Sequence, residues 1–455
     1  MLKRKVMDEL IAWKNNTITK RKALVIKGLR QIGKTYIVKE FAKRYYKNTI
    51  YINFKNNDDI KAIFEPNLDV DRIMFDLSAK MPQIKIEPNN TLLIFDEIQE
   101  CANARAALKP FVEDGRYHVI ATGSLLGIRG YNKKKGKGVP VGAEHFIYMK
   151  PLDFEEFLWA KGINENVIEY LKECYKNKTK ISPAVHESML RYFKEYICVG
   201  GLPEAVNTFI KTNDMNKVYN EQRTILEEYK DDFGKHLDEE EKEETDYKLL
   251  ARITEVFESI PSQLAKENKK FQYSLIKSKG RSSEYREAIQ WLKDAGIISL
   301  CFNLSSLEFP LEGNKIDNVF KIYMQDSGLF ISMLEKGTAG DILYGNLKGY
   351  KGAIFENIVA DAFSKMDKNL YYYHKDSGLE IDFITRLNRE VTLVEVKAKS
   401  GHTKSSDYIL NHYDEYNVKS LVKLGEYNIG YTDNKLTIPY YLAFLLKDEL
   451  IDIKL

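Results

Sequence analysis

Short apolar runs alternate with amphipathic segments over the first 125 residues of the chain. The runs are nearly continuous, which is typical of strands buried on both faces, and they lie at residues 24–27, 49–54, 91–95 and 117–124. Between them apolar residues recur at three- and four-residue intervals, which predicts helices. Strands that alternate with helices predict an α/β fold whose parallel sheet binds ligands at the carboxyl ends of its strands.

The pattern changes after residue 150. It is helical from 151 to about 225, apart from the turn VGGLPEAV at 199–206, and the acidic run 238–246 reads as a solvated linker. Two helices and a strand pair are predicted within 247–335, the order of a winged helix; its second helix, expected to begin with Ser282 as N-cap, could enter a DNA groove or only pack on its neighbours. A helix, three strands and another helix follow from residue 349. We therefore expect four domains, at 1–155, 156–235, 236–340 and 341–455.

Composition narrows the class of protein. A chain of 455 residues is too long for one core, and 44% hydrophobic with 30% charged residues is typical of a soluble globular protein. No apolar run approaches the roughly 18 to 20 residues that span a membrane, and the charged N-terminus lacks the apolar core of a signal peptide, so we expect a cytoplasmic protein. Four cysteines without a C-x-x-C pair predict neither disulfides nor zinc, and a net charge of +3 gives no global basic field for nucleic acid.

The sequence GLRQIGKT at 28–35 carries the first candidate chemistry. It has the G-x-x-x-x-G-K-T spacing of a phosphate-binding loop (P-loop), between an apolar strand and a helix. In such a loop backbone N–H groups face phosphate oxygens, Lys34 reaches the β- and γ-phosphates, and Thr35 offers its hydroxyl to Mg²⁺. The alternative is an accidental glycine turn with an exposed lysine. The expected nucleotide-binding residues are Gly28, Arg30, Gln31, Ile32, Gly33, Lys34, Thr35 and Tyr36.

A second motif supports the nucleotide. TLLIFDE at 91–97 is an apolar strand that ends in two acids, where Asp96 can hold Mg²⁺ and Glu97 can polarise the attacking water. At the end of the run 117–124, Thr122 or Ser124 could contact that water or the γ-phosphate, and Ser124 is our candidate; a strand-ending turn is the alternative. Lysines 133, 134, 135 and 137 could touch phosphates, although a solvated loop is commoner. A proline beside a glycine backbone offers adenine a flat surface, so Gly201 and Pro203 are candidates to contact the base.

Acidic residues and a lysine converge in the last predicted strands. The two-residue period of a strand places Glu395 and Lys397 on one face, and a hairpin can bring Asp382 beside them. Asp382, Glu395 and the carbonyl of Val396 could ligate Mg²⁺, with Glu356 completing the shell, while Lys397 orients or deprotonates a water. This set suits phosphodiester hydrolysis. A strand with an exposed ion pair is the alternative.

The chain resembles, end to end, ATPases that pair an AAA-type P-loop domain with a C-terminal domain of unknown function, number 4143. The segments that match are GLRQIGKT, LLIFDEIQ, IATGSLLG, PLDFEEFL, VGGLPEA, FKIYMQDSGL, ENIVA, EIDF and VEVKA. The resemblance implies a P-loop NTPase sheet with a helical lid, a winged-helix-like domain and a restriction-endonuclease-like α/β domain similar to PD-(D/E)XK nucleases. It also implies, by similarity to archaeal and STAND ATPases, that Gly201 and Pro203 contact the base. Where relatives carry a Gly-Arg pair this chain has Gly142-Ala143, so an arginine finger is not carried over, and Arg105, Arg116 and Arg129 are the candidates.

These observations favour an ATPase that binds ATP with Mg²⁺ and uses hydrolysis as a conformational switch, with a C-terminal effector or partner-binding domain. An ATP-regulated, Mg²⁺-dependent nuclease that acts on DNA or RNA is the alternative, and a nucleotide-gated DNA-binding protein is a third reading. The expected partners are ATP and ADP, DNA or RNA through the winged-helix and C-terminal domains, and a second copy of the chain, with no membrane.

Overall fold

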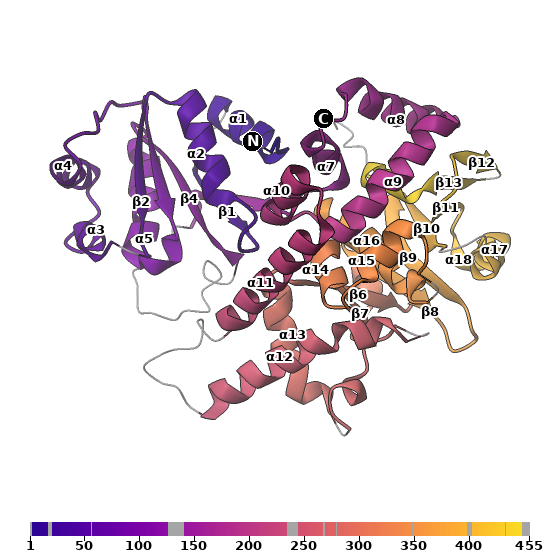
Figure 1. The fold of residues 1–455 in the computed structure, drawn as a ribbon. Helices are drawn as coiled ribbons and strands as arrows, with labels where there is room; N and C mark the ends of the chain where they lie inside the picture. Colours follow the sequence, from indigo (N-terminus) through magenta and orange to yellow (C-terminus); the bar gives the residue numbers. More distant parts are fainter. Residues whose placement is uncertain are drawn as a thin grey trace. The chain divides into compact units, whose positions relative to one another are not determined.

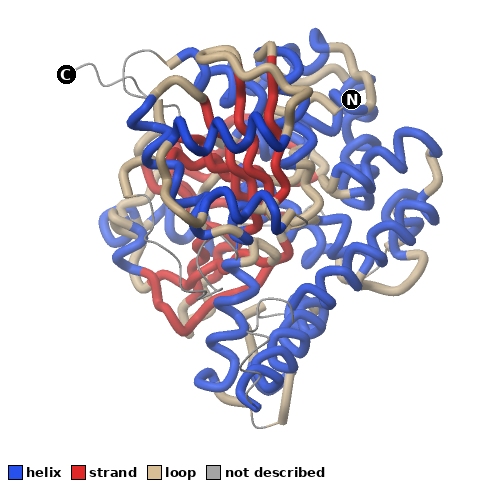
Figure 2. The backbone as a smooth tube through the Cα atoms, turned by 90° about the vertical axis from the view of Figure 1, so that its left-hand side faces the viewer, coloured by secondary structure: helices blue, strands red, loops and turns tan. Residues whose placement is uncertain are grey.

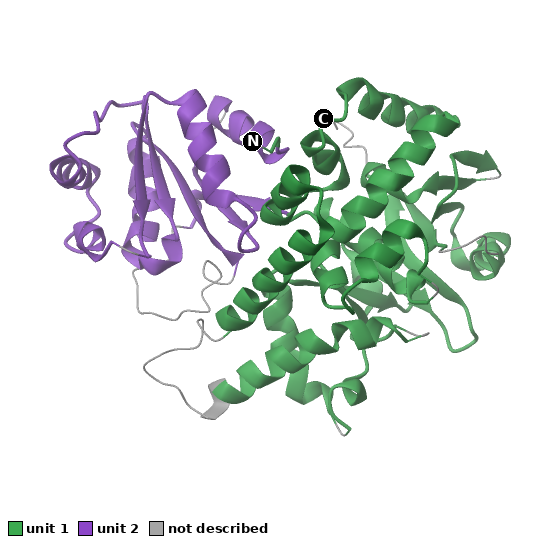
Figure 3. Cartoon of the chain, viewed as in Figure 1, with its two compact units in different colours: residues 1–3, 151–233, 243–455 green, residues 4–150, 234–242 purple. Residues whose placement is uncertain are grey.

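A computed structural model of the chain divides into two compact units, which are described separately (Figure 3). The N-terminal unit comprises Arg4–Lys150 and Gly234–Lys242, and the C-terminal unit comprises Met1–Lys3, Pro151–Phe233 and Glu243–Leu455. The structure describes residues 2–16, 21–55, 57–125, 141–233, 244–266, 269–278, 280–347, 349–397, 403–432 and 434–447.

The N-terminal unit is built on a five-stranded parallel sheet of order β2-β3-β4-β1-β5 (Figure 1). Its strands are β1 (Ala23–Gly28), β2 (Asn48–Asn53), β3 (Thr91–Asp96), β4 (His118–Ser124) and β5 (Glu144–Met149). The helices are α1 (Val6–Asn15), α2 (Lys34–Tyr45), α3 (Asp58–Lys61), α4 (Val70–Lys80) and α5 (Ala102–Asp114). Every residue of β1 and β3 is buried, as their continuous apolar runs predict. The prediction of an α/β parallel sheet is confirmed.

The C-terminal unit begins with helices, as the pattern from 151 onward predicts. They are α7 (Phe154–Ala160), α8 (Glu165–Asn177), α9 (Pro183–Val199), α10 (Pro203–Thr212), α11 (Met215–Phe233) and α12 (Glu244–Leu264). A capping box between Asp153 and Glu156 starts α7, and prolines occupy the first positions of α9 and α10, where a missing N–H costs no hydrogen bond.

An eight-stranded sheet of order β12-β13-β11-β10-β9-β8-β6-β7 forms the rest of this unit. Figure 2 draws the strands of both sheets in red. Its strands are β6 (Ile298–Leu304), β7 (Lys315–Met324), β8 (Leu370–His374), β9 (Glu380–Leu387), β10 (Glu390–Val396), β11 (Ser420–Gly425), β12 (Gly430–Thr432) and β13 (Lys435–Pro439). The helices around it are α13 (Ser282–Asp294), α14 (Ser327–Ser332), α15 (Thr338–Tyr344), α16 (Lys351–Lys365), α17 (Lys404–Asn411) and α18 (Tyr413–Tyr416).

The β6–β7 hairpin, expected as the wing of a separate domain, is part of this sheet. Strand β6 pairs with β7 on one side and, in parallel, with β8 on the other, where Cys301 lies opposite Leu370. The boundary expected at residue 340 therefore falls inside one hydrogen-bonded sheet. Helix α13 itself starts at Ser282, with Arg281 rather than Ser282 at the N-cap position. No helix within the described ranges is long and apolar enough to cross a bilayer.

Candidate nucleotide site and C-terminal charge cluster

The loop between β1 and α2 has the geometry that phosphate binding requires. Gln31 and Gly33 adopt left-handed backbone angles, with φ of 61° and 85°, and Gly33 is the N-cap of α2. A Cβ on Gly28 would lie 2.4 Å from the carbonyl oxygen of Met149, so only glycine fits there. Because the first N–H groups of a helix have no partner within the helix, the start of α2 provides donors for an anion.

The candidate residues of this loop differ in exposure. Ile32 is buried, Arg30 is half-buried, and Tyr36 is 53% exposed. Lys34 folds back on the loop, where its Nζ donates to the carbonyl oxygens of Gly28 at 3.1 Å and Leu29 at 2.8 Å. Both acceptors are neutral.

Burial lowers the pKa of Lys34 to about 8, although the nearby Glu97 carboxylate opposes the shift. The ammonium is therefore held in a place where an additional negative charge would stabilise it.

Asp96 ends β3 and is surrounded by neutral donors. Its Oδ1 accepts from the hydroxyls of Thr35, at 2.9 Å, and Thr122. Its Oδ2 accepts from Tyr51 Oη at 2.7 Å and Asn53 Nδ2 at 3.3 Å. Thr35 and Asp96 were predicted to lie together, whereas Tyr51 and Asn53 were missed. Their only sequence signal is two polar side chains, two residues apart, at the end of the strand that becomes β2.

The order of the strands explains how these groups meet. Strand β4 lies between β1 and β3, so its carboxyl end, with Thr122 and Ser124, is placed between the loop and Asp96. Ser124 is buried, but Thr122 is the residue that bonds Asp96. Glu97 has a left-handed backbone with φ of 52°, and its Oε2 accepts from Gln99. The roles of Glu97 and Ser124 in hydrolysis stay predictions.

This site fits Mg²⁺ brought by a nucleotide. The Thr35 hydroxyl and the Asp96 carboxylate present two hard oxygens within 2.9 Å of each other. Mg²⁺ in NTPases takes one or two protein ligands and completes its octahedron with phosphates and water. Lys34, Thr35 and Asp96 are thus positioned for a magnesium–nucleotide complex.

Two of the candidate arginines, Arg105 and Arg116, are engaged by acids of the same unit. Arg105 forms a two-point ion pair with Glu144, with Nε–Oε1 at 3.0 Å and Nη2–Oε2 at 3.2 Å. Arg116 bonds Asp114 and Asp71, each at 2.6 Å, and precedes β4 at the edge of the sheet opposite the loop. Arg129 and lysines 133, 134, 135 and 137 lie outside the described residues.

Gly201 and Pro203 have structural roles in the C-terminal unit. The N–H of Gly201 donates to Asp326 at 2.7 Å, and its carbonyl oxygen accepts from the N–H of Leu152 at 2.7 Å. A Cβ on Gly201 would lie 2.1 Å from the Leu152 carbonyl oxygen. Three of the segments quoted above, PLDFEEFL, VGGLPEA and FKIYMQDSGL, therefore meet here. Contact of Gly201 and Pro203 with a base stays a prediction.

The predicted C-terminal residues converge, each with a partner from the protein. Glu395 accepts from Lys397 Nζ at 2.5 Å and from the hydroxyl of Ser406. The pairing of β8 with β9 shifts register between Tyr371 and Tyr373, so β9 has one residue more than β8 in the stretch that contains Asp382. Its Oδ2 accepts from the N–H of Val396 at 2.7 Å.

Glu356 on α16 is buried against residues that precede it by far in sequence. It accepts from Lys269 and, at 3.1 Å, from Tyr323 Oη, and Lys321 lies 3.9 Å away. Burial works against ionisation of Glu356, but Lys321 and Lys269 outweigh it and hold its pKa below the usual value. Burial, with Glu356 and Glu395 nearby, raises the pKa of Asp382.

These residues do not fit the magnesium site that resemblance to the nuclease superfamily implies. Glu356 and Glu395 are paired with lysines, and Asp382 is used by a backbone N–H. Within the described ranges, no three His, Cys, Asp or Glu side chains are grouped as a metal site would require. Lys269 and Lys321 were missed because they precede the expected boundary at 340. The available signal was a lysine inside the apolar strand VFKIYM.

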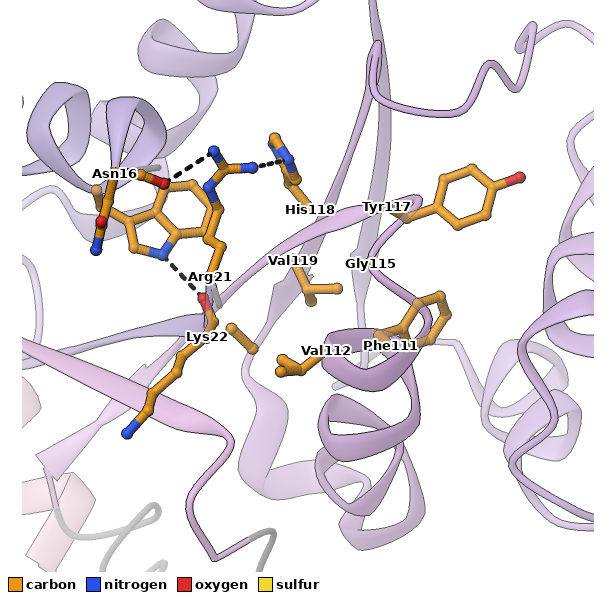
Figure 4. A pocket seen from close by; sticks show the side chains of 11 residues that line it. Asn16, Arg21, Lys22, Phe111, Val112, Gly115, Tyr117, His118 and Val119 are labelled. Atoms are coloured by element: carbon orange, nitrogen blue, oxygen red, sulfur yellow. Dashed lines mark hydrogen bonds between the residues drawn. The ribbon is translucent and has the colours of Figure 1, made fainter. Parts of the chain in front are cut away.

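A pocket of about 350 Å³ lies at the amino ends of β1 and β4, the edge of the sheet opposite the loop (Figure 4). Arg21 bonds the Nε2 of His118, and Tyr46 Oη bonds its Nδ1 at 2.6 Å. Burial, with Arg21 and Lys14 adding, lowers the pKa of His118 to about 4. The imidazole is thus neutral at pH 7, and its position separates it from the nucleotide site.

Comparison with known proteins gives matches to three domain families. Residues 20–158 match the model of an AAA domain. Residues 351–442 match the domain of unknown function DUF4143, so both parts of the expected resemblance are confirmed. Residues 190–339 match a third model, the domain of unknown function DUF8612, which was not expected. The chain has no significant match among curated proteins.

Solved structures give weak similarities. The ORC2 protein of Aeropyrum pernix, described as ADPNP-ADP complexes, is 12% identical over 75% of this chain and 94% of that chain, with a TM-score of 0.36. PCH-2 of C. elegans is 16% identical over 38% of this chain and 47% of that chain, with a TM-score of 0.23. These scores are too low to support an inference about function.

Proposed function

We propose that this protein is an ATPase that binds magnesium–ATP at residues 28–35 and uses binding and hydrolysis as a conformational switch for its C-terminal unit. One observation carries the proposal. The Lys34 ammonium donates hydrogen bonds to neutral carbonyls, and the Asp96 carboxylate accepts them from neutral donors, so each site can take a further opposite charge. The phosphates of ATP would supply negative charge to Lys34, and Mg²⁺ would supply positive charge to Asp96. The match to an AAA domain supports the same reaction.

Glu97→Gln tests hydrolysis, because Asp96 still holds the metal while the water-polarising carboxylate is lost. We expect ATP affinity within about twofold of wild type and a fall in turnover of roughly 10²- to 10⁴-fold. Binding of a fluorescent ATP analogue and single-turnover hydrolysis measure the two quantities. Glu100→Gln, which changes an exposed acid in the 3-10 helix Ile98–Glu100 that follows Glu97, is the matched control. Parental turnover in Glu97→Gln would mean that another residue acts as the base.

The switch itself is tested with the same variant. Glu97→Gln trapped with ATP should differ from the ADP-bound form in amide hydrogen exchange of the C-terminal unit. Identical exchange in the two forms would refute the switch. A nucleotide-bound structure with residues 199–206 far from the base would refute the predicted contact of Gly201 and Pro203.

The alternative, an ATP-regulated nuclease, rests on the convergence of Asp382, Glu395 and Lys397. Their pairing with protein donors weighs against it. Labelled DNA and RNA incubated with Mg²⁺ or Mn²⁺, with and without ATP, test it directly. Cleavage that Lys397→Ala abolishes would favour the nuclease, and binding without cleavage would favour a DNA-binding effector.

A further inference from the structure

Lys321 on β7 is a fully buried lysine in the middle of the C-terminal carboxylates. Its side chain has no exposed surface. Its Nζ lies 3.3 Å from Glu380 Oε1, 3.9 Å from Glu356 Oε2 and 4.7 Å from the centre of the Tyr372 ring. Removing an ammonium ion from water costs several kcal/mol, and only close negative charge offsets that cost. The position of Lys321 is therefore set by these acids.

The cluster is close to neutral without any added ion. Its three ammonium groups are Lys269, Lys321 and Lys397, and the carboxylates of Glu356, Glu395 and Glu380 balance them. Asp382, whose pKa is raised by burial, adds at most part of a further negative charge. Lys269 and Lys397 bond Glu356 and Glu395 directly, and Glu380 lies at the rim with 37% of its side chain exposed. A divalent ion bound between Glu356 and Glu380 would have to take the place of the Lys321 ammonium, which repels it for as long as that lysine is present.

We infer that Lys321 is the resident cation of the C-terminal site and provides the positive charge that a divalent metal would provide in a nuclease with these acids. The lysine comes from β7 and its acids come from α16 and β9, so it ties the segment before residue 340 to the segment after it. The site therefore needs no metal ion, and it connects β7 to α16 and β9 within the C-terminal unit. This inference does not depend on the proposed ATPase.

Lys321→Met tests the inference, because methionine keeps much of the volume and removes the charge. In nucleotide-free, full-length protein we expect Tm to fall by roughly 6 to 20 °C, as loss of one partner of a buried ion pair implies. Millimolar Mn²⁺ should restore a large part of that fall in the variant and leave wild-type Tm unchanged. The matched control is Lys365→Met, which removes another buried lysine, paired with Asp361 at 2.7 Å. It should lower Tm with no response to Mn²⁺.

Electron paramagnetic resonance of Mn²⁺ gives a second measurement, which does not depend on Lys321→Met being folded. It compares Mn²⁺ binding by wild type and by folded Glu395→Gln. Wild type and Glu395→Gln should bind the same amount of Mn²⁺. Loss of a bound Mn²⁺ in Glu395→Gln would overturn the inference, because the carboxylates would then hold a metal in the native protein. A folded Lys321→Met protein that Mn²⁺ does not stabilise would overturn it as well.

Discussion

The nucleotide loop and the C-terminal cluster both hold acids and a lysine, but they balance charge in opposite ways. At the loop, Lys34 donates to carbonyl oxygens and Asp96 accepts from hydroxyls and an amide. In the cluster, lysines donate to carboxylates. Burial lowers the pKa of Lys34, whereas for Lys321 the carboxylates of Glu356, Asp382 and Glu380 outweigh burial and raise it.

The difference distinguishes a binding site from a structural one. Charges held by neutral dipoles keep most of their field for an incoming ligand, while charges held by opposite charges cancel. A motif such as EVK in VEVKAK names the residue types but not their partners. Whether a metal ion can bind these acids depends on the groups that already donate hydrogen bonds to them.

The largest expected effect is a difference in stability between two variants, each of which removes one carboxylate, one from the C-terminal cluster and one from the nucleotide site. Glu356→Gln leaves Lys269 and Lys321 in the buried cluster without one of their carboxylates, so we expect a loss of about 3–5 kcal/mol in the free energy of unfolding. Asp96→Asn removes a charge whose hydrogen-bond donors are neutral, and the nucleotide-free protein should change by only about 1 kcal/mol. Denaturant unfolding, with hydrogen exchange of β7 and α16 as the local probe, measures both. Equal losses in the two variants would break the comparison.

The second effect is on ATP affinity. Lys34→Ala removes the cation that would face the phosphates. A hydrogen bond to a charged group contributes about 1.5–3 kcal/mol, so we expect ATP affinity to fall by roughly 10- to 100-fold. Lys397→Ala, whose charge is already matched by Glu395, should leave ATP affinity within about twofold. Titration with a fluorescent ATP analogue measures it, and Lys43→Ala, an exposed lysine in the last turn of α2, is the control. Near-normal ATP affinity in Lys34→Ala would refute the assignment of residues 28–35 as a phosphate-binding loop.

The smallest effect is a pH dependence of that affinity. The pKa of Lys34 is about 8 in the folded protein and 10.5 when unperturbed, and ATP prefers the protonated form. Affinity should be constant below pH 8 and fall above it by up to about tenfold per pH unit, less as far as bound phosphate raises the pKa. Stability changes in the opposite direction. The unfolded chain binds more protons between pH 8 and 10.5, so the cost of burying the charged ammonium is relieved and the free energy of unfolding increases as pH rises through this range. Lys34→Met should show no fall in affinity above pH 8, and a fall as steep as in wild type would assign the titration to another group.

Local signals in the sequence were sufficient for much of the fold. The strand before Gly28, the helix after Gly33 and the strand ending at Asp96 were predicted within a residue or two, because each depends on its own apolar run and on glycine at the turn. Long-range partners were not predictable in the same way. Nothing in ISLCFNL indicates that β6 pairs with β8, some 70 residues later. The two polar side chains of TIYINF, Tyr51 and Asn53, do not by themselves indicate that Asp96 is their partner.

The pairing of β6 with β8 also limits how this chain can be divided. The match to DUF4143 begins at residue 351, after β6 and β7. A fragment cut there would carry β8 as a bare edge strand, with its N–H and C=O groups free to pair with another copy, and would leave Glu356 without Lys269 and Lys321. Unpaired edges of this kind promote aggregation. An expressible C-terminal piece would therefore have to start near residue 151, where the main part of this unit begins. Gene fusions made at the 340 boundary would be expected to yield insoluble material.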